Sequence, residues 1–302
     1  MTRAVLFDEY GGPEVLRLAD LPEPEPGPGQ VRIRVRAAGV QPADTKLRSG
    51  AWRSWAPVTF PARLGNEAAG VVDAVGAEVT GFAPGDEVLG PANGAYADAV
   101  VTDARLLALK PAALSWSEAG ALSASGQTAS TVLEDLGVGP GETLLINAAA
   151  GGVGLMAVQI AVARGVRVIG TAREANHDFL RGLGAIPVTY GPGLADRVRA
   201  VAPQGVDAAL DAAGGDALDI SLDLVGKPDR VGTIVDQAAA SRLGVRSLGT
   251  RRSGSRLAEL AAMATAGELR VFVWKEFPLA AAAEAHRESE GRHLRGKIVL
   301  VP

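Results

Sequence analysis

Residues 143–158 read TLLINAAAGGVGLMAV, and this stretch decides the fold of the chain. Thr143–Asn147 is a short, mostly apolar run, glycines follow it at positions 151, 152 and 154, and a second apolar run continues beyond them. A run of about four to eight apolar residues that ends at a turn signal is typical of a buried strand. The stretch therefore predicts a strand, a glycine turn and a helix rather than a membrane span.

The turn between the two runs has the pattern of a loop that binds a dinucleotide. Ala149-Ala150-Gly151-Gly152-Val153-Gly154 is G-x-G-x-x-G with alanine at the first glycine position. In such a loop Gly151 would let the backbone approach a pyrophosphate, and Gly154 would let the helix pack closely on the strand. The unpaired N–H groups at the helix N-terminus would face the phosphates.

The strand–helix alternation repeats along the chain. Ser115 and Glu118 form a capping box that opens a helix towards Leu136. We then predict strands at 143–147, 166–171, 187–190, 206–211 and 230–235, with helices at 153–164, 174–183, 194–201 and 216–224. This rhythm implies a doubly wound parallel sheet that helices cover on both faces.

The first third of the chain has the pattern of β-structure. Val31, Ile33 and Val35 alternate with arginines at 32, 34 and 36, which predicts a strand with a solvated arginine face. Further strands are predicted at 69–75, 87–89 and 96–101. A helix at 255–266, a strand at 271–273, a helix at 279–288 and a closing strand at 297–301 lack the strand–helix rhythm. We expect the last of these pieces to return to the first domain.

The end of the second strand of the alternation bears on the choice of nucleotide. An NAD-binding protein usually has an acidic residue there, which accepts hydrogen bonds from the ribose. This chain has Thr171 and Ala172, followed by Arg173. A guanidinium suits a 2′-phosphate, which a carboxylate would repel. The sequence therefore favours NADPH over NADH, with a solvated surface arginine as the alternative, and His177 could contact the nucleotide.

Composition and spacing exclude several other classes of protein. The 302 residues include no cysteine, which excludes a disulfide scaffold, a thiolate zinc site and a cysteine nucleophile. The imidazoles are His177, His286 and His293, and none has the spacing of a metal site. A net charge of −4 argues against a nucleic-acid partner. No targeting or membrane segment is evident, and we expect a cytoplasmic protein.

Six blocks, spread over almost the whole chain, resemble one family. They are residues 11–16 (GGPEVL), 38–50 (AGVQPADTKLRSG), 64–72 (LGNEAAGVV), 85–88 (GDEV), 148–154 (AAAGGVG) and 295–300 (RGKIVL). The chain resembles the zinc-independent quinone oxidoreductase branch of the medium-chain dehydrogenase/reductase superfamily. The resemblance implies an α/β fold with a GroES-like, mostly β catalytic domain at 1–115 and 268–302. It also implies a Rossmann dinucleotide-binding domain at 116–267 and a homodimer.

The resemblance also assigns roles to residues. Gln41, Asp44 and Trp52 become candidates for contact with the substrate. Contacts with NADPH are implied for Thr45, Lys46, Thr128, Ala150, Gly151, Gly152, Val153, Gly154, Thr171, Ala172, Arg173, His177, Tyr190, Ala213 and Asp236. Zinc-dependent relatives have a cysteine where Gln41 stands and a histidine where Asn66 stands. Neither replacement offers the ligand that a catalytic zinc requires, so the site is expected to hold no metal.

The function that the resemblance implies is NADPH-dependent hydride transfer to a quinone or an α,β-unsaturated carbonyl. Gln41 or Thr128 would donate hydrogen bonds to the acceptor, solvent would supply the proton, and Trp52, Trp55 and Phe60 could wall a flat ligand. Two alternatives stay open. One is a pathway-specific enoyl reductase of biosynthesis, although Trp52 stands near the place of a tyrosine proton donor in some such enzymes. The other is an NADPH-binding sensor or structural protein with little turnover.

Overall fold

The computed structural model describes residues 1–291 and 294–302, and the chain folds as two compact units. Unit 1 comprises Met1–Ala124, Arg252–Ala266 and Val271–Pro302. Unit 2 comprises Ser125–Arg251 and Gly267–Arg270. The helix α2 (Trp116–Asp135) contributes residues to both, and Ser115 and Glu118 cap it as predicted, through hydrogen bonds of 2.9 and 3.3 Å.

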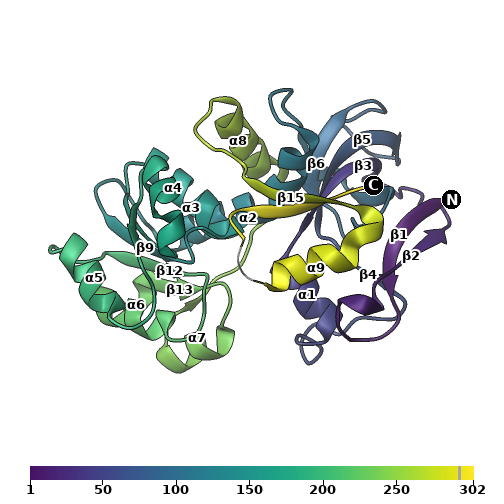
Figure 1. The fold of residues 1–302 in the computed structure, drawn as a ribbon. Coiled ribbons are helices and arrows are strands. Elements are labelled where there is room, and N and C mark those ends of the chain that lie inside the picture. Colours follow the sequence, from purple (N-terminus) through teal and green to yellow (C-terminus); the bar gives the residue numbers. More distant parts are fainter. Residues whose placement is uncertain (292–293) are drawn as a thin grey trace. The chain divides into compact units, whose positions relative to one another are not determined.

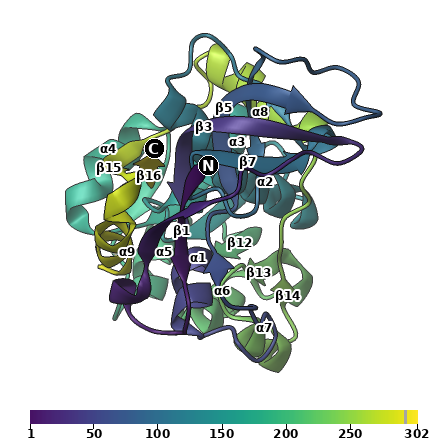
Figure 2. The ribbon, with the colours of Figure 1, turned by 90° about the vertical axis from the view of Figure 1, so that its right-hand side faces the viewer.

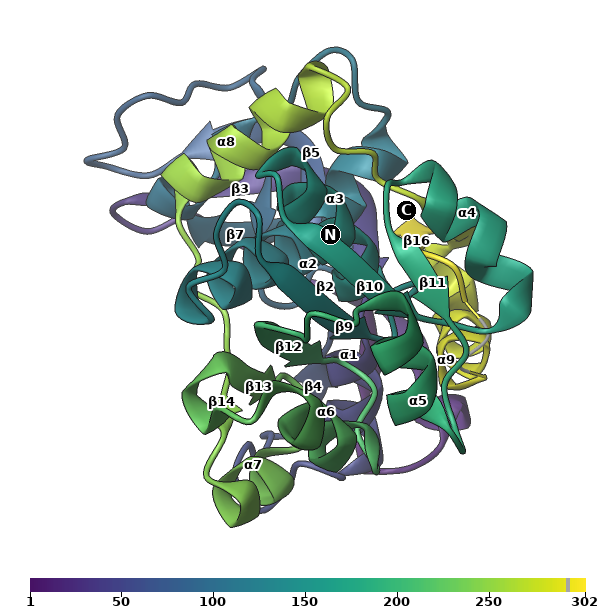
Figure 3. The ribbon, with the colours of Figure 1, turned by 90° about the vertical axis from the view of Figure 1, so that its left-hand side faces the viewer.

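Unit 2 is built on a parallel sheet whose strand order is β11-β10-β9-β12-β13-β14 over the described residues (Figure 3). Counted along the chain, this is the order 3-2-1-4-5-6 of a Rossmann fold. The strands are β9 (Thr143–Asn147), β10 (Arg167–Thr171), β11 (Ile186–Val188), β12 (Ala208–Asp211), β13 (Val231–Thr233) and β14 (Arg246–Ser247). The loop after β9, at the centre of the sheet, is therefore where a dinucleotide loop belongs.

Helices connect these strands. They are α3 (Gly152–Ala163), α4 (His177–Gly182), α5 (Leu194–Val201), α6 (Ala217–Val225) and α7 (Gln237–Leu243), with the 3-10 helices η3 (Glu174–Asn176) and η4 (Pro228–Arg230). The core between sheet and helices includes Leu145, Ile169, Val198 and Leu218, all of which are fully buried. Burial of strand residues on both faces explains why the strands appear in the sequence as continuous apolar runs.

Unit 1 contains two sheets over the described residues. The smaller has the order β2-β1-β4, and the larger has the order β15-β16-β3-β5-β6-β8 with β7 also paired to β3 (Figure 2). The strands are β1 (Thr2–Phe7), β2 (Arg17–Leu21), β3 (Gln30–Val40), β4 (Ala62–Arg63), β5 (Glu67–Val75), β6 (Glu87–Pro91), β7 (Ala99–Asp103), β8 (Ala108–Leu109), β15 (Val273–Pro278) and β16 (Lys297–Val301). The C-terminal strand β16 pairs antiparallel with β3 beside residues 38–40, so the chain end does return to the first unit.

The helices of unit 1 are α1 (Pro42–Ser49), α8 (Gly254–Thr265) and α9 (Ala282–Glu290), with the 3-10 helices η1 (Pro13–Val15), η2 (Ala104–Leu106) and η5 (Leu279–Ala281). In Figure 1 the yellow α9 lies beside α1, which follows β3 directly. The structure places residues 116–124 and 252–266 in unit 1, whereas the sequence analysis gave them to the nucleotide-binding domain. The reason for α8 is close packing, since a Cβ on Gly254 would lie 2.6 Å from the carbonyl oxygen of Leu107.

The predicted arginine face exists, and two of its three arginines, Arg32 and Arg34, form ion pairs, while Arg36 is exposed. Nε of Arg32 donates to Oδ1 of Asp73 over 2.8 Å, and Arg34 bonds to Asp73 and Glu23. These ion pairs hold two segments against the same face of β3. One is the proline-rich segment 22–28 (PEPEPGP), which contains Glu23, and the other is the strand β5, which contains Asp73. The predicted strand at 271–273 differs more, because pairing with β16 places β15 at Val273–Pro278.

Candidate active site

The loop after β9 has the backbone geometry of a phosphate cradle. Ala148 has a φ of 57°, a left-handed conformation that non-glycine residues rarely adopt and that often marks a functional site. Gly151 is the N-cap of α3, and no side chain among the described residues caps it. The first N–H groups of α3 therefore remain available for an anion, and the helix dipole favours one there.

The glycines of this loop have separable roles. A Cβ on Gly154 would collide with the carbonyl oxygen of Ala148 and lie 2.8 Å from Cα of Ala149, so this position must be glycine for α3 to pack on the loop. A Cβ on Gly151 would meet only the carbonyl oxygen of Ala148, at 3.3 Å, and its φ of −78° suits any residue. The 3.3 Å contact is tight, but a shift of a few tenths of an ångström in the backbone of Ala148 would relieve it, so the fold constrains position 151 less than position 154.

The residues predicted around the adenosine phosphate gather at the carboxyl end of β10 and β11. Thr171 is buried, and its Oγ1 accepts from the N–H of Ala148 over 3.1 Å, which ties β10 to the loop. Arg173 is exposed just beyond the strand. Nε2 of His177 lies 3.3 Å from the carbonyl oxygen of Ala172, and Tyr190 is 53% exposed. An arginine and an aromatic side chain are thus available at this edge of unit 2.

Sequence reasoning missed the residue that holds the Tyr190 segment. Arg197, on α5, donates to the carbonyl oxygens of Thr189 (2.8 Å), Tyr190 (3.3 Å), Gly191 (3.1 Å) and Pro192 (2.9 Å). A single guanidinium thus fixes four consecutive peptide groups. No sequence signal identifies Arg197, because it is one of two arginines on an amphipathic helix.

The remaining cofactor candidates of unit 2 lie on its connections. Oγ1 of Thr128 lies 2.6 Å from Oγ1 of Thr250, so one hydroxyl donates to the other. Asp211, at the end of β12, accepts from the N–H of Ala213 over 2.9 Å. The side chain of Asp236 caps α7 by accepting from the N–H of Ala239 over 2.9 Å. A cofactor contact through Asp236 is therefore limited to its backbone or its remaining carboxylate oxygen.

In unit 1 the helix α1 is anchored by Asp44. Its Oδ2 accepts from the N–H of Gln41 (2.9 Å) and from the hydroxyl of Tyr96 (2.9 Å), and its Oδ1 accepts from the N–H of Gly65 (3.2 Å). Burial raises the pKa of Asp44 to about 6, although these hydrogen bonds and the charge of Lys297 oppose the rise. Burial, and then the charge of Asp44, raise the pKa of Tyr96 well above its usual value. Asp44 therefore fixes the start of α1, and its carboxylate oxygens are already engaged.

Gln41 makes contact with a carboxylate that the sequence analysis did not single out. Nε2 of Gln41 donates to Oε1 of Glu67, the first residue of β5. Nζ of Lys297, on β16, lies 3.0 Å from the same oxygen, and Oε2 accepts from the N–H of Ala124 over 2.6 Å. Glu67 is 0% exposed and the Lys297 side chain 4%. In the sequence, the only signal that could have pointed to Glu67 was its position next to Asn66.

The other predicted residues of unit 1 are Thr45 and Lys46 on α1 and three aromatic residues in the segment that follows it. Oγ1 of Thr45 donates to the carbonyl oxygen of Pro42 over 2.9 Å. Nζ of Lys46 lies 5.2 Å from the ring of Trp52, which packs on Trp55 at 4.6 Å. Phe60 packs instead on Tyr10 and Phe7, at 5.0 and 5.6 Å. The three aromatics predicted as one wall are thus a tryptophan pair and a separate phenylalanine.

The two histidines that the structure describes, His177 and His286, lie in different units. His286, on α9, is buried, and its Nδ1 lies 3.3 Å from Nη1 of Arg48. Burial, and then the charge of Arg48, lower the pKa of His286 to about 3. His177 lies in unit 2, and His293 lies outside the described residues. In the part of the chain that the structure describes, no three His, Asp or Glu side chains are grouped so that they could hold a metal ion.

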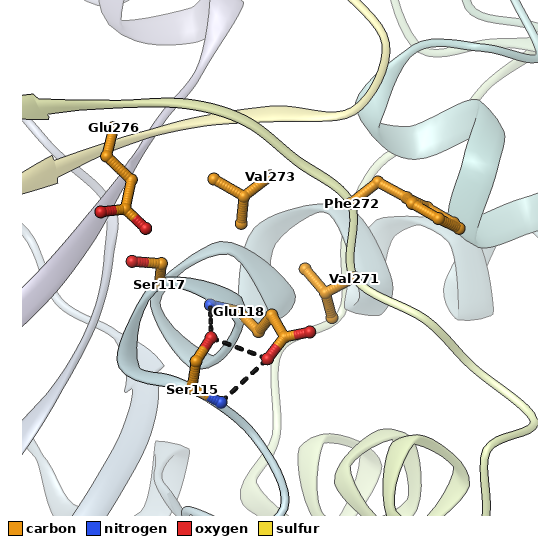
Figure 4. A pocket seen from close by; sticks show the side chains of 7 residues that line it. All are labelled: Ser115, Ser117, Glu118, Val271, Phe272, Val273 and Glu276. Atoms are coloured by element: carbon orange, nitrogen blue, oxygen red, sulfur yellow. Dashed lines mark hydrogen bonds between the residues drawn. The ribbon is translucent and has the colours of Figure 1, made fainter.

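Unit 1 also has a cavity of about 390 Å³, and none of the residues predicted to bind substrate or cofactor lines it (Figure 4). Its lining is Ser115, Ser117, Glu118, Val271, Phe272, Val273 and Glu276. Figure 4 shows Glu118 turned back to Ser115, as the capping box requires. Two of the polar residues of this cavity, Ser115 and Glu118, therefore serve the start of α2.

None of the helices described has the length and apolarity that crossing a bilayer would require.

Comparison with known proteins agrees with the fold. The alcohol dehydrogenase GroES-like domain model matches residues 27–113, and the zinc-binding dehydrogenase model matches residues 183–300. A GroES-like unit, a Rossmann unit and a glycine loop together define an oxidoreductase of the medium-chain type.

The relatives narrow this class further. Quinone oxidoreductase of Pseudomonas aeruginosa is 36% identical in an alignment of 334 positions that covers 100% of both proteins. Erythronolide synthase EryA2 of Saccharopolyspora erythraea is 42% identical in an alignment of 259 positions that covers 79% of this chain but 7% of that protein. Among solved structures, Escherichia coli quinone oxidoreductase complexed with NADPH has a TM-score of 0.89 at 28% identity, covering 99% of this chain and 100% of that one. The chain belongs to the quinone oxidoreductase branch of the medium-chain dehydrogenase/reductase superfamily.

Proposed function

We propose that this chain is an NADPH-dependent oxidoreductase that reduces a quinone or an α,β-unsaturated carbonyl without zinc. The observation that carries the proposal is the uncapped N-terminus of α3 behind Gly151, with Arg173 at the end of the neighbouring strand. The full-length similarity to a quinone oxidoreductase, and the NADPH bound in the similar E. coli structure, support it.

The residues of unit 2 fit NADPH. Ala150–Gly154 would hold the pyrophosphate through backbone N–H groups, because no side chain of the described residues fills the space at Gly151. Arg173, His177 and Tyr190 would face the adenosine phosphate, and Thr128, Ala213 and Asp236 would line the path to the nicotinamide. From unit 1, Thr45 and Lys46 would contact the nicotinamide. When bound, the dihydronicotinamide supplies a hydride, which carries two electrons.

The residues of unit 1 do not fit a catalytic zinc, although one matching family model carries zinc in its name. Zinc sites use cysteine thiolates, imidazoles and carboxylates. Gln41 directs its amide nitrogen, which is no metal ligand, to Glu67, and Asn66 offers only an amide. The oxygens of Asp44 accept three hydrogen bonds from the protein. The proposed reaction therefore uses no metal ion.

Without a metal, hydrogen-bond donors must stabilise the negative charge on the acceptor's oxygen. Gln41 Nε2 has two N–H groups, and the bond to Glu67 uses one, which leaves the other for the acceptor. Hydride addition to a quinone gives a hydroquinone anion, and a proton from solvent completes the hydroquinone. With an enone, the hydride adds to the β-carbon and a solvent proton to the α-carbon.

A pathway-specific enoyl reductase is the second candidate. The similarity to a segment of erythronolide synthase EryA2 favours it, since its 42% identity exceeds the 36% identity to the Pseudomonas quinone oxidoreductase. Trp52 stands near the place where some enoyl reductases have a tyrosine proton donor. An indole N–H does not give up a proton at neutral pH, so such an enzyme would take its proton from elsewhere.

The test follows the oxidation of NADPH and NADH by absorbance with protein treated with a chelator. A 1,4-naphthoquinone and a simple enone serve as acceptors. We expect rapid loss of NADPH with the quinone, slower loss of NADH, and no gain on addition of Zn²⁺. Turnover with the enone alone would favour the enoyl reductase, tight NADPH binding without turnover would favour a sensor, and absence of binding would refute the proposal.

We also propose a homodimer that works in the cytoplasm. Support for the dimer comes from the two edge strands of the unit 2 sheet, β11 and β14, whose outer edges pair with none of the described strands. Such an edge is a ready template for a second copy. Sedimentation of the purified protein tests the dimer, and cell fractionation tests the location.

A further inference from the structure

The carboxylate of Glu67 is held from three sides inside unit 1. Gln41 on the edge of α1, Lys297 on β16 and the backbone of Ala124 on α2 each contact it. Gly39 makes room for this arrangement, because a Cβ there would lie 2.8 Å from Cδ of Glu67 and from the carbonyl oxygen of Gly120. The geometry of the carboxylate is therefore set by three separate elements.

This arrangement fixes the orientation of the Gln41 amide. An ionised carboxylate accepts hydrogen bonds and cannot donate them, so the atom of Gln41 that faces it must be the amide nitrogen. A neutral partner that can donate as well as accept would also allow the reverse orientation, with the amide oxygen towards position 67. Nζ of Lys297 lies 3.0 Å from the carboxylate and attracts its negative charge.

Stability alone does not account for the pair. Removing two charges from water costs free energy that their attraction often fails to recover, so a buried ion pair is weak evidence for a stabilising role. Nζ of Lys297 has no well-aligned hydrogen-bond acceptor among the described residues, which makes its burial costlier still. A pair that is costly for folding, and that sits directly behind a candidate substrate residue, suggests a role in the reaction.

We propose that Glu67 and Lys297 are a positioning pair that holds the Gln41 amide with its second N–H directed at the oxygen of the acceptor. The inference deepens the proposed function and rests on it, because that oxygen belongs to the substrate. Neither Glu67 nor Lys297 touches the reacting atoms; both act through Gln41. The pair gives this chain a fixed hydrogen-bond donor in place of the metal that its zinc-dependent relatives use.

The first test compares the double variant Glu67→Gln/Lys297→Met with the wild type. The double variant removes both charges of the pair together, and Asp44 keeps its three hydrogen bonds, so the double variant is expected to fold. With NADPH and 1,4-naphthoquinone, we expect kcat to fall about 10- to 100-fold while the Kd for NADPH stays within about 2-fold, since one oriented hydrogen bond to developing charge is lost. A purely structural pair would change the melting temperature and leave kcat unchanged.

A matched control is available in the same unit. The side chain of Lys110 is 6% exposed, and its Nζ lies 3.1 Å from Oε2 of Glu87. Lys110→Met therefore also removes a lysine with a buried side chain from an ion pair, but this lysine follows β8 and pairs with the first residue of β6, whereas Glu67 lies opposite Pro91, the last residue of β6. We expect Lys110→Met to retain the wild-type kcat. An equal loss of kcat in both proteins would overturn the positioning role.

A second measurement does not depend on turnover. The two side-chain amide protons of Gln41, assigned by their absence in Gln41→Ala, report its hydrogen bond in an NMR spectrum. We expect one proton to lie downfield in the wild type, because bonds to a carboxylate are short and strong. It should move towards the free-amide position in the double variant and stay in Lys110→Met. If the wild type proves inactive, the proposed function fails, while these signals still decide the pair; unmoved signals in the double variant overturn it.

Discussion

The hydroxyl of Tyr96 donates a hydrogen bond of 2.9 Å to Oδ2 of Asp44, and both side chains are at most 1% exposed. This bond partly offsets the cost of burying the Asp44 carboxylate at the start of α1. The offset is incomplete, because burial still raises the pKa of Asp44 from 3.8 to about 6. The hydrogen bonds through which Asp44 anchors α1 are therefore sensitive to pH.

The first prediction concerns the stability of the wild type relative to Asp44→Asn. Because the folded-state pKa lies above the unfolded value, the contribution of Asp44 to stability is full below about pH 4 and is lost as the pH rises through about 6. Between pH 4 and pH 8, the wild type should lose on the order of 3 kcal/mol relative to Asp44→Asn. Urea unfolding at a series of pH values measures this difference.

Tyr96→Phe checks the cause. Its hydroxyl lowers the pKa of Asp44, so the variant should titrate at a higher pH than the wild type in a ¹³C spectrum of the carboxyl carbon. Tyr10→Phe, which removes a hydroxyl that accepts from the N–H of Val58, should leave the Asp44 midpoint in place. A midpoint near the ordinary aspartate value in the wild type would contradict the argument.

A second prediction has the opposite pH dependence and concerns His286. A guanidinium only donates, so Nδ1 of His286 accepts from Arg48, and the proton sits on Nε2, which is buried without a partner among the described residues. Burial lowers the folded-state pKa from 6.5 to about 3. The stabilising contribution is therefore full above about pH 6.5 and is lost as the pH falls. By pH 5 the loss should be on the order of 2 kcal/mol.

His286→Gln tests this account, because a glutamine oxygen can still accept from Arg48 but does not titrate. Its free energy of unfolding should fall less than that of the wild type between pH 7 and pH 5. His177→Gln, on the surface of unit 2, is the control and should follow the wild type. Parallel curves for the wild type and His286→Gln would refute the assignment.

The elements whose formation depends on local sequence pattern were predicted from the sequence. Strand Thr143–Asn147, helix Leu194–Val201 and closing strand Lys297–Val301 have the predicted bounds, because apolar runs and turn glycines act over a few residues. The helix α1 was not predicted, since its burial of Asp44, Thr45 and Arg48 inverts the usual pattern of apolar residues. Only tertiary contacts with Tyr96 and His286 make such a helix stable.

The candidate site divides in the same way. The glycine loop and Arg173 were found from sequence because a phosphate is recognised by backbone and charge at fixed spacing. Glu67, Lys297 and Arg197 were missed, because their roles arise from strands and helices far apart in the chain. Lys297 lies 230 positions beyond Glu67, and no periodicity links them. Pairing of β16 with β3 brings this lysine into unit 1.

A third prediction separates the two glycines of the loop. Gly154→Ala places its Cβ 2.8 Å from Cα of Ala149 and against the backbone of Ala148, so α3 or the loop must shift. We expect a loss of roughly 1–3 kcal/mol in the free energy of unfolding, as for other overpacked sites. Gly151→Ala should fold with nearly wild-type stability but bind NADPH at least about 10-fold more weakly, because its Cβ would stand where the pyrophosphate approaches. Denaturation and fluorescence titration measure the two effects; a Gly151→Ala protein that binds NADPH normally would argue against the cradle.

A fourth prediction concerns Arg173. If its guanidinium contacts the 2′-phosphate, Arg173→Ala should raise the Kd for NADPH roughly 10- to 100-fold, the value of one charge-assisted hydrogen bond, and leave the Kd for NADH almost unchanged. Arg181→Ala, on α4, removes an arginine that pairs with Asp178 and should change neither. Equal losses for both nucleotides would mean that Arg173 does not read the phosphate.

The fifth prediction concerns Arg197 and the segment that carries Tyr190. Its four hydrogen bonds to carbonyl oxygens hold residues 189–192 in one conformation, so Arg197→Ala should leave the fold intact while freeing that segment. Hydrogen exchange should then accelerate at the amides of Tyr190, Gly191 and Gly193. The Kd for NADPH should rise several-fold, because the segment must be ordered again on binding.

Arg199→Ala is the matched control for this fifth prediction. Arg199 lies on the same helix and pairs with Asp223 through its side chain, over 2.6 Å, rather than with the 189–192 backbone. Its variant should exchange and bind like the wild type. Because Arg197 acts through the shape of the segment, Arg197→Ala should weaken the binding of 2′,5′-ADP as much as that of NADPH. A weaker affinity for NADPH with unchanged exchange at 190–193 would instead mean that Arg197 contacts the nucleotide directly.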